Sequence, residues 1–277
     1  MNLSRRKWLL RLGFYGTPAA CFGYGSLVEK NIHSISRVDI PVTGDRRDLH
    51  GLKIALLSDF HHDDFGNDSL IRRAAKSINE ESVDIVMLTG DYISNEVDAM
   101  EPLCEALADL RPRLGSFAVL GNHDRWSYDE VMPRLLEQAG IRLLINEAVD
   151  FPDFAVAGLD SYWGGSPDLV GALSSISPDK PVIMGWHEPD PFDSYDDPRI
   201  ALQLSGHTHG GQICAPVYGP ILLPRYGKKY PFGYYQNNNR SLYVTRGIGT
   251  LDLPTRFLCA PEVAILTMRD FSLSMPI

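Results

Sequence analysis

The chain has few cysteines, little basic surface and no long, strongly apolar run. Its four cysteines are scattered along 277 residues and include no CxxC pair. In a chain of this size such spacing argues against a disulfide framework, so we expect buried free thiols. Without thiolate pairs, a purely structural zinc site is also disfavoured.

Basic residues are too few for a general nucleic-acid binder. The formal net charge is -9, and because residues 1–50 are net positive, the remainder carries about -13. Affinity for a phosphate backbone requires basic surface, so we expect no nucleic acid among the partners. Bound metal cations would compensate part of the acidic charge.

The N-terminus has an uncharged run that is just too short for a typical spanning helix. Residues 12–28 lack charge but contain Pro18 and four glycines. The preceding residues 4–10, with Arg5 and Arg6, resemble a twin-arginine export signal. We therefore predict a signal or anchor segment at 1–28; an interfacial segment and an ordinary basic start of a soluble protein are the alternatives.

Downstream we predict a linker with one edge strand, then a folded body. The linker covers 29–50, its strand lies near 36–40, and the body covers 51–277. Strands and helices alternate first, with strands at 53–58, 84–89, 116–120 and 141–145 and helices at 69–80, 96–110 and 127–139. Shorter strands follow at 154–159, 181–186, 200–205, 241–247 and 262–268, with one helix near 168–176. This order predicts an α/β fold in which two packed mixed sheets are flanked by helices.

Five apolar runs end in residues that bind metal ions. The donors that follow these runs are Asp59 and His61, then Asp91, Asn122, His187, and finally His207 with His209. Six of the eight histidines lie in these five motifs. Because ligands gather at the carboxyl ends of strands in open α/β sheets, we expect the seven side chains to meet.

The donor set indicates two divalent metal ions. Seven donors are too many for one tetrahedral zinc, but two ions that share a bridging carboxylate use all seven. Such a pair, typically about 3.5–4 Å apart, activates water and clamps a phosphoryl oxygen, which predicts phosphate-ester hydrolysis. Mixed imidazole and carboxylate ligands suit Mn, Fe, Zn or Co better than Mg or Ca, and Mn²⁺ is our first choice.

In their order along the chain, these motifs resemble the calcineurin-like metallophosphoesterase superfamily. The resemblance covers about residues 51–269 and rests on the motifs at 59–61, 90–91, 121–124, 187 and 206–209. It implies a four-layer α-β-β-α sandwich. It also implies a first metal on Asp59, His61 and His209, a bridging Asp91, and a second metal on Asn122, His187 and His207.

The same resemblance gives His123 a catalytic role. His123 would face the substrate and either stabilise the phosphoryl charge or protonate the leaving oxygen. Asp124 would orient the His123 ring and favour its charged form.

Further motifs look like the membrane-associated branch of that superfamily. They lie at 187–190, 210–213, 219–220, 230–233, 243–247 and 254–257. The branch includes UDP-2,3-diacylglucosamine pyrophosphatases of lipid A biosynthesis and twin-arginine-exported envelope phosphoesterases. The first activity is our leading hypothesis and an exported phosphodiesterase or phosphatase is the alternative. A non-catalytic scaffold is a remote third, because no ligand is missing.

Two features bear on the substrate. The apolar residues 217–224 precede Arg225 and two lysines, which suits a loop that dips into a bilayer or a hairpin packed on the body. Arg246 and Arg256 lie in short loops and would hold a phosphate or form surface salt bridges. We expect a lipid-linked or nucleotide-linked phosphorylated substrate at a bacterial cytoplasmic membrane. The cytosolic face suits a lipid A enzyme, and the outer face suits an exported one.

Overall fold

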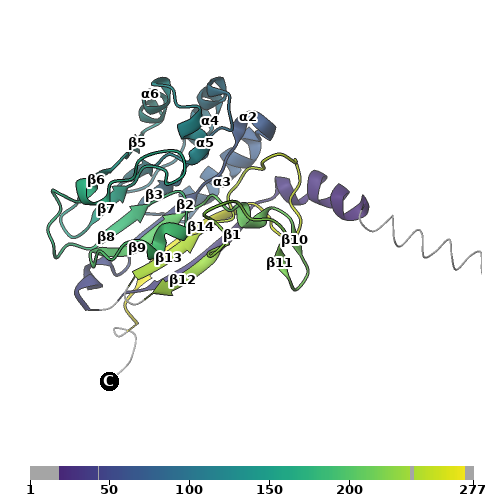
Figure 1. Ribbon diagram of the computed structural model, residues 1–277. Helices are drawn as coiled ribbons and strands as arrows, with labels where there is room; N and C mark the ends of the chain where they lie inside the picture. Colours follow the sequence, from purple (N-terminus) through teal and green to yellow (C-terminus); the bar gives the residue numbers. More distant parts are fainter. Residues whose placement is uncertain (1–18, 43, 238–239, 272–277) are drawn as a thin grey trace, which may run out of the picture.

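Two six-stranded mixed sheets form the centre of the computed structural model, which describes residues 19–42, 44–237 and 240–271 (Figure 1). The first sheet has the order β1-β14-β2-β3-β4-β5. Within it β14 runs antiparallel to β2, and every other pair is parallel. Its strands are β1 (Ser34–Pro41), β14 (Glu262–Arg269), β2 (Lys53–Leu57), β3 (Ile85–Leu88), β4 (Gly115–Ala118) and β5 (Ile141–Leu143).

The second sheet has the order β12-β13-β9-β8-β7-β6. Its inner pairs are parallel, and the strand at each edge is antiparallel to its neighbour. Its strands are β12 (Gly233–Asn237), β13 (Arg240–Val244), β9 (Ile200–Ser205), β8 (Val182–Gly185), β7 (Ala155–Gly158) and β6 (Glu147–Asp150). A separate two-stranded hairpin pairs β10 (Cys214–Ala215) with β11 (Gly219–Pro220).

Helices cover the outer faces of both sheets. Three of them, α3 (Asp68–Glu80), α4 (Met100–Leu107) and α6 (Val131–Gln138), pack on the first sheet, and α7 (Leu169–Ala172) packs on the second. Two short helices, α2 (His62–Phe65) and α5 (Asn122–Trp126), begin beside strand ends. The predicted α/β fold with two packed mixed sheets flanked by helices is confirmed.

The period of two along the strands explains the layers. In β2, Ala55 and Leu57 face the helices, whereas Ile54 and Leu56 face the second sheet. All four side chains are fully buried. Because successive strand residues point to opposite faces, a strand with both faces covered must be apolar throughout.

The structure corrects several predicted boundaries. The edge strand predicted near 36–40 is β1, which is longer than predicted, lies at the edge of the first sheet and pairs along its whole length with the C-terminal β14. The helix predicted at 127–139 is shorter and forms α6 alone, and α5 lies before it, where no helix was predicted. The edge strands β6 and β12 were not predicted; both are short and half-exposed, so they lack a clear apolar pattern.

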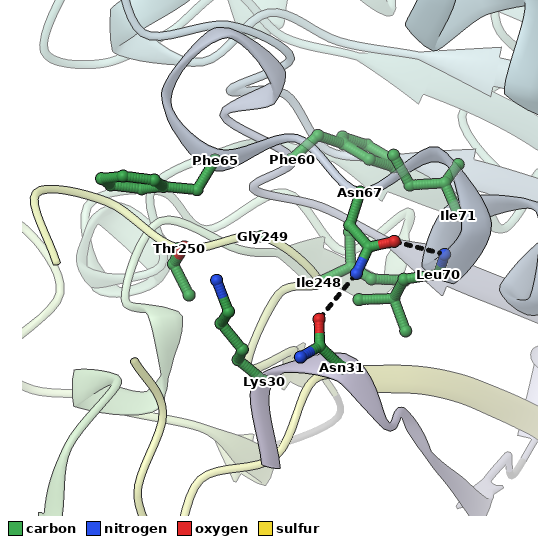
Figure 2. Close-up of a pocket in the computed structure, with 10 residues that line it drawn as sticks. All are labelled: Lys30, Asn31, Phe60, Phe65, Asn67, Leu70, Ile71, Ile248, Gly249 and Thr250. Atoms are coloured by element: carbon green, nitrogen blue, oxygen red, sulfur yellow. Dashed lines mark hydrogen bonds between the residues drawn. The ribbon is translucent and has the colours of Figure 1, made fainter. Parts of the chain in front are cut away.

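The N-terminal segment docks on the body. Residues 19–27 are helical and are followed by a 3-10 turn at Glu29–Asn31. The buried Glu29 carboxylate accepts hydrogen bonds from the backbone N–H groups of Leu258 and Cys259. Figure 2 shows the side-chain oxygen Oδ1 of Asn31 accepting a hydrogen bond from the side-chain amide of Asn67, beside α3; the two atoms are 2.7 Å apart.

Most of the predicted signal or anchor segment, residues 1–18, lies outside the described residues. Among the residues that are described, no helix combines the length and the apolar composition needed to cross a membrane. The four cysteines are free, as predicted, although Cys21 is only partly buried.

A buried arginine holds the C-terminal loops together. The Arg256 side chain is fully buried and donates to the backbone carbonyls of Gly249, Arg246, Cys259 and His209 at 2.6–3.4 Å, and more weakly to Cys259 Sγ at 4.0 Å. A guanidinium presents five donors in a fixed plane, which suits several carbonyls at once. These internal acceptors occupy the Arg256 donors, and its contact with a substrate phosphate stays a prediction.

We expect Arg256→Lys to lower the free energy of unfolding by at least about 3 kcal/mol, because buried carbonyls lose their donors. Urea denaturation of metal-free protein, followed by circular dichroism, measures this change. Arg134→Lys is the matched control on the exposed face of α6, with an expected change within about 0.5 kcal/mol. A loss below about 1 kcal/mol for Arg256→Lys would contradict this role.

Candidate metal centre

The strand-end motifs meet at one place between the two sheets. Two groups of buried side chains each bring three ligand atoms within 4.8 Å of one another. The first group contains Asp59, His61 and His209, and the second contains Asp91, His187 and His207. This division matches the two ligand sets that the family resemblance implies.

Asp91 joins the two groups. Its Oδ2 lies 3.5 Å from His61 Nε2 and 3.1 Å from His187 Nε2. Burial opposes ionisation of Asp91, but His187 and His61 beside it hold the pKa of this carboxyl well below its usual range. An ionised carboxylate between two ligand groups is suited to bridge two cations.

Each of three histidines anchors one ring nitrogen on the protein and turns the other toward the site. A metal-binding histidine generally donates its remote N–H in this way, which fixes the tautomer and the ring orientation. The anchors are Ser94 Oγ at 2.9 Å from His61 Nδ1, the Thr89 carbonyl at 2.5 Å from His187 Nδ1, and the Arg225 carbonyl at 2.7 Å from His207 Nε2.

Several buried polar atoms of the site have no hydrogen-bond partner in the protein. They are His61 Nε2, both ring nitrogens of His209, and Asn122 Oδ1. An unpaired buried polar atom costs roughly 1–3 kcal/mol, so atoms of this kind need a partner. Imidazole nitrogen and amide oxygen both coordinate first-row divalent metals, so these residues fit the predicted metal ions.

The backbone has a left-handed conformation at five of the ligand residues. Asp59, His61, Asp91, His207 and His209 all have φ between 42° and 71°. Non-glycine residues rarely adopt this left-handed conformation, which costs of order 1–3 kcal/mol each and is concentrated at functional sites.

Two glycines allow the ligand segments to approach one another. A Cβ atom on Gly121 would lie 2.1 Å from Asp91 Oδ1, and one on Gly206 would lie 2.4 Å from Asp59 Oδ2. Real Cβ atoms do not come so close, so any side chain at these positions would displace a ligand.

Asp124 has a different position from the one predicted. Its carboxylate accepts hydrogen bonds from the backbone N–H groups of Asp91, Tyr92 and Gly121 at 2.7–2.8 Å. Burial, with the charge of Asp91 nearby, raises the pKa of Asp124 to about 7. The carboxylate therefore shapes the Asp91 loop and starts α5, and its predicted role in orienting the His123 ring stays a prediction.

His123 borders the two ligand groups. Its backbone N–H donates to Asp91 Oδ1 at 3.0 Å, and its ring packs edge-on against His61 with centroids 4.9 Å apart. His123 Nδ1 lies 3.2 Å from the Ser94 carbonyl, which takes the place predicted for Asp124. With Nδ1 held in this way, Nε2 is the ring atom available to a substrate.

Arg246 is also committed within the protein. Its Nη2 lies 3.0 Å from Ser34 Oγ and 3.4 Å from Glu262 Oε1. Burial opposes the charge of Glu262, but Arg246 and neighbouring hydrogen bonds lower the pKa of this carboxyl. These contacts tie β1 and β14 to the loop after β13, and the phosphate contact of Arg246 stays a prediction.

The sequence analysis missed residues that position the loops of the site. Fully buried Glu188 accepts from the backbone N–H groups of Tyr162 and Trp163, and Asp190 accepts from those of Lys228 and Lys229. Glu188 directly follows the ligand His187, and Asp190 comes two residues later. Two acidic residues just beyond a ligand were the signal available, but their partners are backbone groups, which a sequence does not show.

Comparison with known proteins agrees with this geometry. The model of the calcineurin-like phosphoesterase family matches residues 52–211. YkuE, an uncharacterized metallophosphoesterase of Bacillus subtilis, is 35% identical over 97% of this chain and 99% of its own. The phosphodiesterase YaeI of Escherichia coli is 30% identical over 96% of this chain and 99% of its own. The UDP-2,3-diacylglucosamine pyrophosphatase LpxG of Chlamydia muridarum is 25% identical, over 90% and 93%.

The family match covers more than half of the chain and includes the strand-end motifs, and relatives such as YkuE align over almost the whole length. The chain therefore belongs to the calcineurin-like phosphoesterase family. The two buried ligand groups and the phosphodiesterase relative add that it is a metal-dependent phosphoesterase.

Proposed function

We propose that the protein hydrolyses a phosphoester or diphosphate bond in a membrane-associated substrate, with UDP-2,3-diacylglucosamine as the leading candidate. The observation that carries the chemistry is the pair of buried ligand groups joined by Asp91. The ligands that we assign to two divalent ions, Mn²⁺ first, are Asp59, His61, Asp91, Asn122, His187, His207 and His209.

Bound divalent ions would supply Lewis-acid polarisation of the phosphoryl group and a nucleophile at neutral pH. The protein itself positions His123. The Ser94 carbonyl holds Nδ1–H, so the charged ring has its second donor, Nε2–H, directed away from that anchor. We assign to His123 the protonation of the leaving oxygen, a general-acid role.

An apolar hairpin supports a membrane-associated substrate. At the β10–β11 turn Val217 is 103% exposed and Tyr218 is 90% exposed, and Ile221 and Leu222 are also exposed. Large apolar side chains gathered at a tip mark an interaction site. Arg225 follows the hairpin, on the exposed surface, where a cation would meet lipid head groups.

The hairpin is connected to the metal centre and to the N-terminal helix. Arg225 gives its carbonyl to His207, so the segment after the hairpin contacts a ligand directly. Phe257 bridges Ile213 at the base of the hairpin, while its neighbour Arg256 donates its backbone N–H to Gly25 in the helical residues 19–27. Figure 1 shows this helix and the hairpin on the same side of the molecule.

A second candidate function is an exported cell-envelope phosphodiesterase or phosphatase. The phosphodiesterase YaeI, which aligns over almost its whole length, favours it. So does the twin-arginine-like segment at residues 4–10, which lies outside the described residues. The two functions differ in membrane face, because the nucleotide-linked lipid is cytosolic and an exported protein is not.

The metal assignment predicts a stoichiometry. Protein loaded with Mn²⁺ and desalted should hold about two ions per chain, and His209→Ala about one, because the first ligand group loses a member. Mass spectrometry of the metal content measures this. His33→Ala, whose ring lies 3.1 Å from Ser77 away from the site, is the control and should retain both ions. Two ions on His209→Ala would contradict the assignment.

The substrate assignment predicts release of UMP from UDP-2,3-diacylglucosamine by the Mn²⁺-loaded protein in detergent. His123→Ala should lower kcat by about 10²–10⁴, the usual contribution of a general acid, with metal content unchanged. His62→Ala is the control and should keep the wild-type kcat, because the His62 ring pairs with Asp68. Cleavage of an aryl phosphodiester alone, again dependent on His123, would instead select the exported phosphodiesterase.

From the exposed apolar side chains of the hairpin we expect the protein to bind bilayers. The double variant Val217→Glu, Tyr218→Glu should reduce binding to anionic phospholipid vesicles by about tenfold, because two side chains no longer enter the apolar layer. Vesicle sedimentation of the full chain measures the bound fraction. Val170→Glu, at an equally exposed apolar position on α7, should bind like the wild type. Unchanged binding of the double variant would exclude the hairpin as a membrane contact.

A further inference from the structure

Two tryptophans form an aromatic corner beside the metal centre. The ring of Trp126 lies 5.0 Å from His123, that of Trp163 lies 6.0 Å from His207, and the two indoles are 5.0 Å apart with planes at 83°. The corner thus extends from the substrate-facing histidine to a ligand histidine. Tyr226 packs against Trp163 from the other side, at 6.1 Å.

Both tryptophans are attached to segments that carry ligands. Trp126 ends α5, which begins at Asn122, and it lies three residues after His123, on the same side of the helix. Trp163 is held by buried Glu188, which accepts its backbone N–H at 3.1 Å and directly follows His187 in the chain. The position of the corner relative to the ligands is therefore built into the fold.

The indoles are not packed as core residues. Trp126 is 52% exposed and Trp163 is 38% exposed. Within the described part of the chain no acceptor is found for either indole N–H. Trp186 gives the contrast within the same molecule, since it is 4% exposed and its Nε1–H donates to the Asp160 carbonyl at 2.9 Å. Exposed indoles with free donors next to a reactive site are a ligand-binding surface.

We propose that the aromatic corner, Trp126 and Trp163, is the subsite for a flat heterocycle, the nucleobase of a nucleotide-linked substrate. This rests on the proposed function and specifies which part of the substrate lies beside His123. A base stacks on one indole and meets the edge of the other, and its ring carbonyls accept the free indole N–H groups. An acyl chain would leave those donors unpaired.

Calorimetric titration of the full Mn²⁺-loaded chain tests the corner without turnover. UMP should bind more tightly than ribose 5-phosphate, which lacks the base. Trp126→Ala and Trp163→Ala should each raise the Kd of UMP by about tenfold and leave that of ribose 5-phosphate unchanged. Trp126→Phe should retain most of the affinity, because a phenyl ring still stacks. Phe271→Ala removes an aromatic ring that is 54% exposed, after β14 and outside the metal centre, and should bind UMP like the wild type.

Equal affinity of the wild type for UMP and ribose 5-phosphate would overturn the proposal. So would an equal loss for both ligands in the alanine variants, which would indicate structural damage. Hydrolysis of an alkyl phosphodiester, measured in parallel, reports on the metal centre alone and should persist in both variants. Absence of hydrolysis of any phosphoester by the wild type would refute the proposed function, whereas the calorimetry would still decide the role of the corner.

Discussion

The burial of two carboxylates, Asp59 and Asp91, is the constraint on which the rest of the site depends. Both lie at strand ends with almost no exposure, where an isolated negative charge is strongly disfavoured. Histidine side chains approach both carboxylates: two lie within 3.5 Å of Asp91, and His209 lies 3.6 Å from Asp59. Imidazoles that bind a metal ion are neutral and do not compensate two buried charges, whereas divalent cations held between the same atoms would. The acidic, histidine-rich edge of the sheets is therefore stable as a cation site.

The ligand residues have unfavourable backbone conformations. Other buried charged side chains hold these loops in place through hydrogen bonds to the backbone. Asp124 and Glu188 accept backbone N–H groups, and Arg256 donates to backbone carbonyls. In each case a fully buried charged side chain holds a loop that contains or borders a ligand, and its own charge is satisfied by peptide dipoles. Charged residues that look catalytic in the sequence thus serve to position the ligand segments.

The proposed function requires one site to bind a substrate with unlike ends. His207 contacts the Arg225 carbonyl, just after the apolar hairpin, and lies 6.0 Å from Trp163 of the aromatic corner. A phosphate at the metal centre would therefore have an apolar surface on one side and a stacking surface on the other. A nucleotide-linked lipid has its parts in this order, because its phosphates lie between an acyl-bearing sugar and a base.

The sequence by itself determined the α/β fold and which side chains gather at the strand ends, because buried strands show an apolar run and the donors follow each run directly. It did not determine the partners of Asp124, Arg246 and Arg256, since these bind backbone groups or residues such as Glu262 and Ser34 that only folding brings near. Nor did it reveal that β1 joins β14 across the length of the chain, or that Trp126 and Trp163 form a corner. Local periodicity and motif order are written along the chain, whereas contacts between distant loops depend on packing, and the tertiary structure alone decided them.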